Sequence, residues 1–367
     1  MVTSGKNPVE KSLRFAKWVV GIAANPKLWV PVLAGSKPFF PFASRILKAR
    51  IRANLDIRKL LEAEAWDLII IPTSGADPAL FDFLTVAEEM KVPTLALVDN
   101  WDNLVSKTVF WRKPTFLGVW GPQAKQQAVR IHDFQSETVI EVGNPRFEAY
   151  FQNRKAAERG KQSKILFVGS AMPFDEIEAL RLVESSLTHL DLKELEIVYR
   201  PHPWQQQRLT PSAFLESEFL YTTLDEQISS AKELGLQKNG MDLSFQPDLT
   251  YYPRMFDEAL IVVGPLTTLL LEASICLRPV IGLAYNDGYH FTTTLEYFSH
   301  FSEMESMPGF QLCRDTRTLA DQIVRAIADV QIDTAKADAH LARILTRGPD
   351  GYGSQLASLV TKILDSQ

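Results

Sequence analysis

The residues best suited to chemistry lie in loops that directly follow apolar, strand-like segments. One of these loops is Tyr199–Pro203, in which two prolines flank His202. The prolines fix the backbone of this histidine and remove competing N–H donors. We predict that Arg200 and His202 contact the diphosphate or the leaving oxygen of an activated donor. The alternative is a purely structural histidine in a rigid loop.

A second loop, Gly264–Thr268, precedes a helix-like segment that carries Glu272. Thr267 or Thr268 can cap that helix, whose N-terminal N–H groups and positive dipole end favour a phosphate. Glu272 lies one turn further on, where a carboxylate can accept hydrogen bonds from ribose hydroxyls. The alternative is a capped helix with a surface glutamate. A shorter signal adds two more residues to the predicted donor site, Gly169 and Ser170, whose backbone can approach a phosphate.

In the first half of the chain, the run Asp99–Asn103 is more polar than a turn requires. It can hold an acceptor, and Asp99 and Asp102 are the candidates for a catalytic base. The alternative is an Asx-rich turn around a buried Trp101. The residues predicted to face the acceptor or the cleft between two domains are Asn100, Trp101, Asn103 and Arg146.

Strands and helices that alternate along the chain must position these loops. The strand-like segments are Leu68–Ile71, Thr94–Val98, Phe116–Trp120 and Val139–Val142 in the first half, then Ile165–Val168, Leu195–Tyr199, Phe219–Tyr221, Leu260–Val263 and Val280–Leu283. Such alternation predicts crossover connections and parallel sheets with ligands at the carboxyl ends of the strands. The predicted fold is therefore α/β, with two Rossmann-like domains that face each other across a cleft. The chain does not open with a strand, so the first sheet is expected to lack its usual first βαβ unit.

Composition divides the chain into segments. We predict a basic helical segment over 1–60, an acceptor domain over 61–150, a polar linker over 151–163, a donor domain over 164–345, and a C-terminal helix over 346–367 that packs back toward the first domain. The chain has 367 residues, of which 46% are apolar and 23% charged, as in ordinary soluble proteins. Two cysteines give no disulfide framework, and the start has no signal-peptide pattern, so a cytoplasmic location is expected.

The net charge of −5 conceals a basic start. Residues 1–60 carry twelve Lys and Arg against two acids, a net +10, which leaves −15 for the rest. This asymmetry predicts that residues 8–60 meet an anionic membrane surface, with solvated basic helices as the alternative. The apolar stretch 18–36 is not expected to span a membrane, because it contains Lys27 and two prolines. Nucleic acid is not an expected partner, because the sheet-bearing region is acidic.

Three motifs resemble those of bacterial glycosyltransferases of the GT-B fold. They are GNPRFE at 143–148, YRPHP at 199–203 and GPLTTLLLEASICLRPVIGL at 264–283. The resemblance covers about residues 65–330 and is closest to surface-polysaccharide and capsule enzymes and to CDP-glycerol glycerophosphotransferases. It implies that the RPHP segment faces the donor phosphates, that a Ser/Thr pair begins the donor helix, and that an acidic residue of that helix binds donor. The threonines and the glutamate here, in place of serines and aspartate, favour a nucleotide-sugar donor over CDP-glycerol.

The function implied by this resemblance is transfer of a sugar, or of a sugar or polyol phosphate, from an activated diphosphate donor. The acceptor is expected to be a growing cell-surface polysaccharide, such as capsule or O-antigen, or a lipid-linked molecule, at the inner face of the cell membrane. No metal and no cofactor are expected, because Arg, His and helix N–H groups neutralise the leaving diphosphate. Phosphoribosyl diphosphate and a CDP-polyol stay open as donors. The alternatives are a sugar-nucleotide epimerase, which should surround the sugar with carboxylates, and a non-catalytic partner protein of the same fold.

Overall fold

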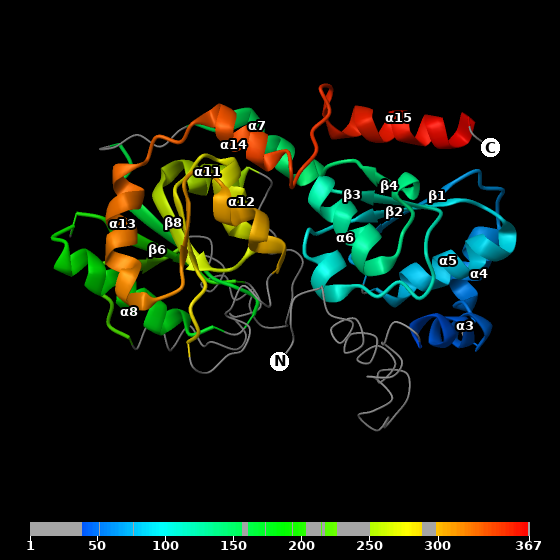
Figure 1. Cartoon of the computed structure of the whole chain (residues 1–367), viewed down its shortest axis with the longest axis horizontal. Helices are drawn as coiled ribbons and strands as arrows, with labels where there is room; N and C mark the ends of the chain where they lie inside the picture. Colours follow the sequence, from blue (N-terminus) through cyan, green and yellow to red (C-terminus); the bar gives the residue numbers. More distant parts are fainter. Residues whose placement is uncertain are drawn as a thin grey trace, which may run out of the picture. The chain divides into compact units, whose positions relative to one another are not determined.

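The computed structural model describes residues 39–50, 52–75, 77–155, 161–172, 174–192, 194–202, 214, 217–225, 250–287 and 299–365 (Figure 1). The chain divides into two compact units. The first unit is Met1–Pro145 with Phe298–His300 and Ala342–Gln367, and the second unit is Arg146–Tyr297 with Phe301–Leu341. Most of the predicted basic segment, and the whole of 18–36, lie outside the described residues.

The first unit contains a sheet of four parallel strands. They are β1 (Ile69–Thr73), β2 (Thr94–Val98), β3 (Phe116–Val119) and β4 (Val139–Glu141), hydrogen-bonded in the order of the chain. The four strands predicted in this half are confirmed. Between them lie α5 (Pro78–Met90) and α6 (Pro122–His132), each of which begins with a proline and ends at a left-handed residue, Lys91 and Asp133 respectively. These are favourable helix ends, because an N-terminal proline loses no hydrogen bond and a left-handed residue stops the helix.

Further helices of the first unit come before, between and after these strands along the chain. In the described residues α3 (Phe40–Arg50) and α4 (Leu55–Glu62) precede β1, and a short π-helix, η1 (Asn103–Lys107), follows β2. The last helix, α15 (Gly351–Asp365), belongs to the first unit. Its Gln355 side chain donates to the backbone carbonyl of Glu141, 2.9 Å away.

The second unit contains six parallel strands in the order β10-β9-β8-β5-β6-β7. The bounds are β5 (Lys164–Val168), β6 (Glu196–Arg200), β7 (Thr222–Leu224), β8 (Ala259–Pro265), β9 (Val280–Leu283) and β10 (Phe310–Cys313). All seven residues of β8 are buried, as expected of a central parallel strand covered on both faces. The α/β fold with two parallel sheets is therefore confirmed.

Two strands of this sheet differ from the predictions. The segment Phe219–Tyr221, predicted as a strand, is not one. The strand β7 begins at Thr222, directly after the end of that segment. Phe219 instead stacks on Phe214 as part of a loop, with 5.2 Å between the ring centroids. The edge strand β10 was not predicted, because its half-buried alternation of Phe, Gln, Leu and Cys is a weak strand signal.

Helices cover the second sheet on both faces (Figure 1). Their bounds are α7 (Glu148–Asn153), α8 (Glu176–His189), α11 (Tyr251–Glu258), α12 (Thr268–Ile275), α13 (Leu319–Ala328) and α14 (Thr334–Leu341). The inward residues of α8 and α13 form one core cluster with β5, β6, β8 and β9. Among the described residues, none of the helices combines the length and apolar character that a membrane span requires.

Candidate ligand-binding site

The order of strands in the second unit identifies one point as favourable for a ligand. The chain runs from β5 outward to β6 and β7, then returns to the other side of β5 and continues outward through β8, β9 and β10. The direction of winding therefore reverses between β5 and β8. In open parallel sheets, ligands bind beyond the carboxyl ends of the strands at such a switch point. Here the loop 169–175 and the segment Leu266–Thr267 leave the sheet on the two sides of that point.

The N-terminus of α12 lies on one side of the switch point. Thr267 is its N-cap, in an extended conformation with φ −137° and ψ 157°, and its hydroxyl makes no capping hydrogen bond. The first turn of α12 carries no acidic side chain. The helix dipole and the N–H groups of this turn therefore present positive potential toward an anion. Thr267 and Thr268 are half-buried, which leaves their hydroxyls within reach of a ligand.

Gly169 lies on the other side, where the loops after β5 and β6 meet. Its N–H donates to the carbonyl of Arg200 at 2.8 Å. A Cβ atom at this position would lie 2.6 Å from Oε2 of Glu176 and 2.8 Å from the backbone nitrogen of His202. Only glycine fits this contact, and its presence brings the half-buried His202 against the loop that follows β5.

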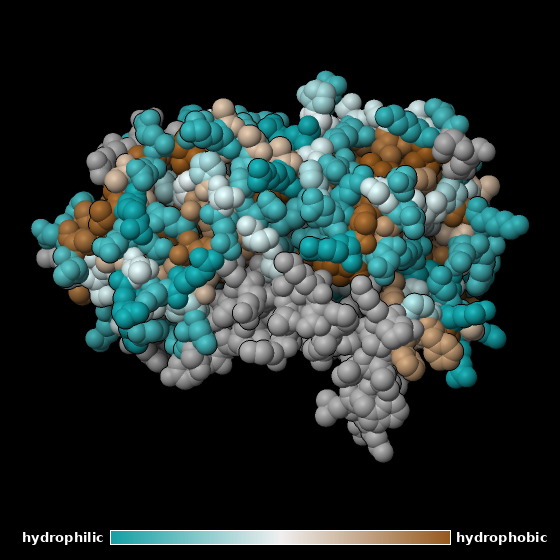
Figure 2. Space-filling model, viewed as in Figure 1, coloured by the Kyte–Doolittle hydropathy of each residue, from teal (hydrophilic) through white to brown (hydrophobic). Residues whose placement is uncertain are grey.

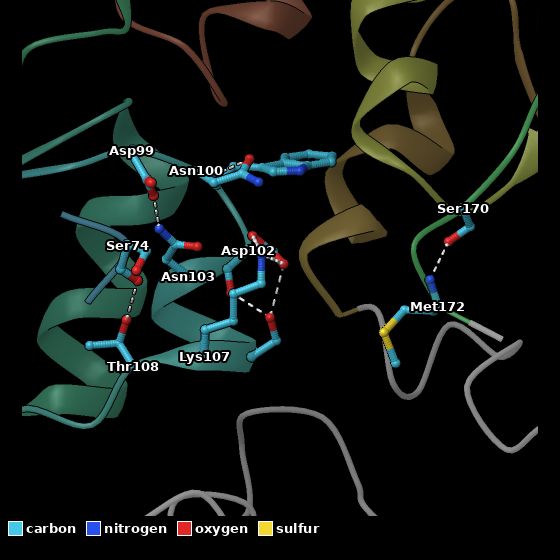
Figure 3. Close-up of polar contacts among 11 residues, drawn as sticks. Ser74, Asp99, Asn100, Asp102, Asn103, Lys107, Thr108, Ser170 and Met172 are labelled. Carbon is cyan, nitrogen blue, oxygen red and sulfur yellow. Dashed lines mark hydrogen bonds and ion pairs between the residues drawn. The ribbon is translucent and has the colours of Figure 1, made fainter. Parts of the chain in front are cut away.

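Glu176, which was not predicted from the sequence, holds that loop in place through hydrogen bonds. Its carboxylate is fully buried and accepts from the N–H of Ser170 at 2.8 Å and from the hydroxyl of Tyr199 at 2.5 Å. Burial raises the pKa of Glu176 to about 7, although both hydrogen bonds act in the opposite direction. Ser170 is itself buried, and its hydroxyl accepts from the N–H of Met172 at 3.1 Å (Figure 3). The sequence offered one signal for Glu176, an acidic residue in the first turn of the helix after Gly169–Ser170.

Arg200 is buried within the second unit rather than open to solvent. Its guanidinium lies 3.5 Å from the carboxylate of the buried Asp225 and donates to the hydroxyl of Tyr252 at 3.4 Å. Tyr251 completes the cluster by donating to Asp225, and both tyrosine rings lie under the guanidinium. Arg200 is therefore placed to fix the end of β6, two residues before His202. Its direct contact with a donor phosphate stays a prediction.

Glu272 is also buried, with no exposed surface, so it is not the surface glutamate of the alternative interpretation. One carboxylate oxygen pairs with Arg146, and the other accepts from the hydroxyl of Tyr150. Burial raises the pKa of Glu272, against the opposing effects of Arg146 and Tyr150. Because both oxygens have partners within the protein, Glu272 is placed to hold α12 and Arg146. A contact between Glu272 and a ribose stays a prediction.

Arg146 was expected to face the acceptor or the cleft between two domains, which stays a prediction; it is the first residue of the second unit. Its side chain is 40% exposed while its partner is fully buried. The guanidinium is thus held by Glu272 on one side and reaches the surface on the other. The GNPRFE motif therefore contributes a half-exposed cation close to α12.

The loop after β2 in the first unit is a network of hydrogen bonds (Figure 3). Asp99 is exposed, and its carboxylate accepts from the side-chain amide of Asn103. Asp102 is ion-paired with Lys107 at 3.0 Å and accepts from the hydroxyl of Ser106 at 3.1 Å. Among the described residues, the carboxylate of Asp99 is hydrogen-bonded to a neutral amide, whereas the carboxylate of Asp102 is paired with a cation. Asp99 is therefore the better candidate for a base.

The other three residues of this loop, Asn100, Trp101 and Asn103, are buried or half-buried in the first unit. Trp101 is buried at 2% exposure and meets the ring of His300 edge-on, with 4.8 Å between ring centroids. Asn103 is buried at the start of the π-helix η1. Asn100 is half-buried and accepts from the N–H of Trp101 at 3.1 Å. A contact of these three residues with an acceptor stays a prediction, and the burial of Trp101 agrees with an Asx-rich turn.

A hollow of about 500 Å³ lies elsewhere in the first unit, beside α6 and β4. Its lining includes Lys125, Arg130 and Glu141 and none of the residues singled out by the motifs. None of its lining residues lies at the switch point of the second sheet, so we do not assign the site to it. Among the described residues, no group of three or more His, Cys, Asp or Glu side chains is arranged to hold a metal ion. Cys276 and Cys313 are buried free thiols.

No protein-family model and no curated protein matches the sequence. Solved structures match by fold. The UDP-GlcNAc 2-epimerase of Methanocaldococcus jannaschii, in complex with UDP-GlcNAc and UDP, gives a TM-score of 0.52 at 15% identity over 84% of this chain and 79% of that chain. A putative UDP-N-acetylglucosamine 2-epimerase from Listeria monocytogenes gives 0.50 at 12% identity over 88% and 78%. The wall teichoic acid polymerase TagF gives 0.43 at 12% identity over 89% and 98%, too weak to weigh further. The likenesses to the two epimerase structures show that the chain has the GT-B type of fold.

Proposed function

We propose that this chain is a glycosyltransferase that uses a nucleotide-sugar donor and transfers the sugar to a polysaccharide or lipid-linked acceptor. The observation that supports this best is the meeting of three elements at the switch point between β5 and β8. These are the glycine-permitted loop at Gly169, the neighbouring His202, and the uncapped N-terminus of α12. The N-terminus of α12 offers N–H groups and the ring of His202 offers a hydrogen-bond donor, which suits a diphosphate, while the loop at Gly169 brings His202 into position.

In the proposed reaction the acceptor hydroxyl attacks the donor carbon and the nucleoside diphosphate leaves. The N-terminal N–H groups of α12 and the half-exposed Arg146 stabilise the charge that develops on the leaving diphosphate. His202 donates a hydrogen bond or a proton to the leaving oxygen. Buried groups, chiefly Glu176 and Glu272, hold these elements in place. Asp99 in the first unit is our candidate base for the acceptor, and its approach to the donor stays a prediction.

An epimerase acting on the same donor is the main alternative. Epimerisation requires groups that remove and return a proton on the sugar, and we expect several carboxylates around it. In the described loop after β2, Asp102 is engaged by Lys107, which leaves Asp99 as the accessible carboxylate. One accessible carboxylate in this loop is enough for the base that a transferase requires. The likeness to epimerases rests on fold and is common to both activities.

The experiment follows the fate of each nucleotide sugar by phosphorus and proton NMR, with and without oligosaccharide and polyprenyl-phosphate acceptors. A transferase releases nucleoside diphosphate only when an acceptor is present. An epimerase gives new sugar signals without release, and a non-catalytic partner gives neither. Either of the last two results would contradict the proposal.

The same assay tests His202. The variant His202→Ala should lower turnover by about 10²–10³-fold if the ring stabilises developing charge. His189→Ala, at the exposed end of α8, is the matched control and should leave turnover unchanged. Equal turnover in the two variants would remove His202 from the mechanism.

A further inference from the structure

One exposed surface of the first unit is not explained by sugar transfer. Residues Phe39, Phe42 and Ile46, at and within α3, are 47%, 60% and 41% exposed. They are spaced three and four positions apart, so they lie along one face of the helix. The rings of Phe39 and Phe42 meet edge-on, with 6.5 Å between their centroids. Figure 2 shows apolar side chains at the surface where Figure 1 places α3.

The adjacent face of α3 packs against the protein. Phe40, Ala43 and Leu47 pack against the hydrophobic core of the first unit. The helix is therefore anchored through one apolar face while a second apolar face points outward. A helix that only needed to cover the core would gain nothing from two exposed phenylalanines, because exposed apolar area is unfavourable in water.

The charged side chains of this segment have one sign. Arg45, Lys48, Arg50 and Arg52 are all exposed, and the first acidic residue after Phe39 is Asp56. Further along, the cation Arg58 differs from these four because it is neutralised by Glu62 and Glu89, at 3.1 Å and 2.6 Å. The helix thus combines aromatic and branched apolar side chains on one face with cations at its edges, Arg45 and Arg50, and with Arg52 just beyond its end. This is the pattern of a helix that lies in the interface of an anionic bilayer.

We propose that α3 docks the chain on the surface of an anionic lipid bilayer. Phe39, Phe42 and Ile46 enter the boundary between headgroups and acyl chains. Arg45, Arg50 and Arg52 lie at headgroup level and meet the lipid phosphates. Within the basic segment predicted over residues 8–60, α3 is therefore the helix that contacts the bilayer. The proposal uses no residue of the candidate ligand site, so it stands or falls separately from the proposed function.

Co-sedimentation of the full chain with vesicles tests this docking. Vesicles of phosphatidylcholine alone are compared with vesicles that also contain phosphatidylglycerol. Binding should require the anionic lipid and should weaken as salt is raised, because salt screens the attraction. The double variant Arg45→Ala/Arg50→Ala should lower the partition coefficient by about 30-fold, since each cation near the surface contributes about 1 kcal/mol. Phe42→Ser/Ile46→Ser should lower it by at least about tenfold, because apolar burial is lost.

Matched controls come from the second unit. Val324→Ser removes an apolar side chain of similar exposure, 44%, from α13. Arg317→Ala/Lys336→Ala removes two exposed cations. Both should bind vesicles like the unaltered chain, and the unfolding midpoint of every variant is measured to show that it is folded. Equal binding to neutral and anionic vesicles, no binding to either, or binding that both α3 variants retain would each overturn the proposal. If this face binds a protein partner instead, the chain should bind neither kind of vesicle.

Discussion

Arg146 and Glu272 form an ion pair although they are 126 positions apart in the sequence. Glu272 is fully buried in the second turn of α12, and Arg146 is the first residue of the second unit. Tyr150 shares the same carboxylate. The segment that begins the second unit is thereby fastened to the helix whose N-terminus flanks the switch point. The GNPRFE motif consequently has a positioning role in the proposed donor site.

Loss of the Glu272 carboxylate should destabilise the second unit. Glu272→Ala leaves Arg146 and the hydroxyl of Tyr150 without their acceptor and creates a cavity, so we expect a loss of about 3 kcal/mol in the free energy of unfolding. Glu258→Ala is the matched control, because Glu258 forms an exposed pair with Lys164 and should cost less than about 1 kcal/mol. Urea unfolding of both variants measures the difference. Equal costs would show that the buried pair does not hold α12.

A methyl group at Gly169 should damage the candidate site directly. Gly169→Ala forces the loop after β5 away from His202 and Glu176, and we expect a loss of roughly 1–3 kcal/mol in stability with weaker donor binding. The matched control is Gly353→Ala in α15, where an added Cβ meets nothing within 4 Å. That change should stabilise the chain by roughly 0.5–1 kcal/mol, because alanine favours the helix. If Gly169→Ala behaves like the control, the close approach of the two loops is incorrect.

The buried Glu176 should make stability depend on pH. Its pKa is about 7 in the folded chain, because burial favours the protonated form, and near 4.5 when unfolded. Between pH 4.5 and 7 the folded state therefore holds a proton on Glu176 that the unfolded state has lost. The stabilisation that Glu176 contributes is complete below pH 4.5 and is lost as the pH rises through 7. The shift corresponds to a loss of about 3 kcal/mol across this window.

Glu176→Gln removes that dependence, because the amide resembles the protonated acid and can donate to the oxygen of Tyr199. The stability of the variant relative to the unaltered chain should rise between pH 4.5 and 7 and then level off. Glu178→Gln, an exposed neighbour on the same helix, is the control. Urea unfolding across this range provides the measurement, and a difference that stays constant with pH would contradict the assignment.

The sequence predicted the strands well because nearly all of them are buried apolar runs bounded by glycine, proline or polar loops. It also predicted that His202, Thr267 and Asp99 directly follow strands, as they do after β6, β8 and β2, whereas their contact with a ligand stays a prediction. Burial could not be predicted from the motifs. Arg200 and Glu272 have the residue types of ligand contacts, yet Asp225 and Arg146, distant in sequence, pair with them inside the fold. Glu176, at the start of α8, was missed for the same reason, because its partner Tyr199 lies 23 positions away, on β6.

Calorimetric titration of nucleoside diphosphates and nucleotide sugars tests the central claim most directly. Thr267→Asp is the informative variant, because aspartate is a good N-cap for α12 but places a negative charge where we propose that the diphosphate binds. Thr334→Asp, at the exposed start of α14, is the matched control. We predict that one nucleotide class binds the unaltered chain and the control in a one-to-one ratio. Thr267→Asp should bind it at least about tenfold more weakly while keeping its stability. If no nucleotide or nucleotide sugar binds, or if Thr267→Asp binds as tightly as the control, the donor site is not at α12.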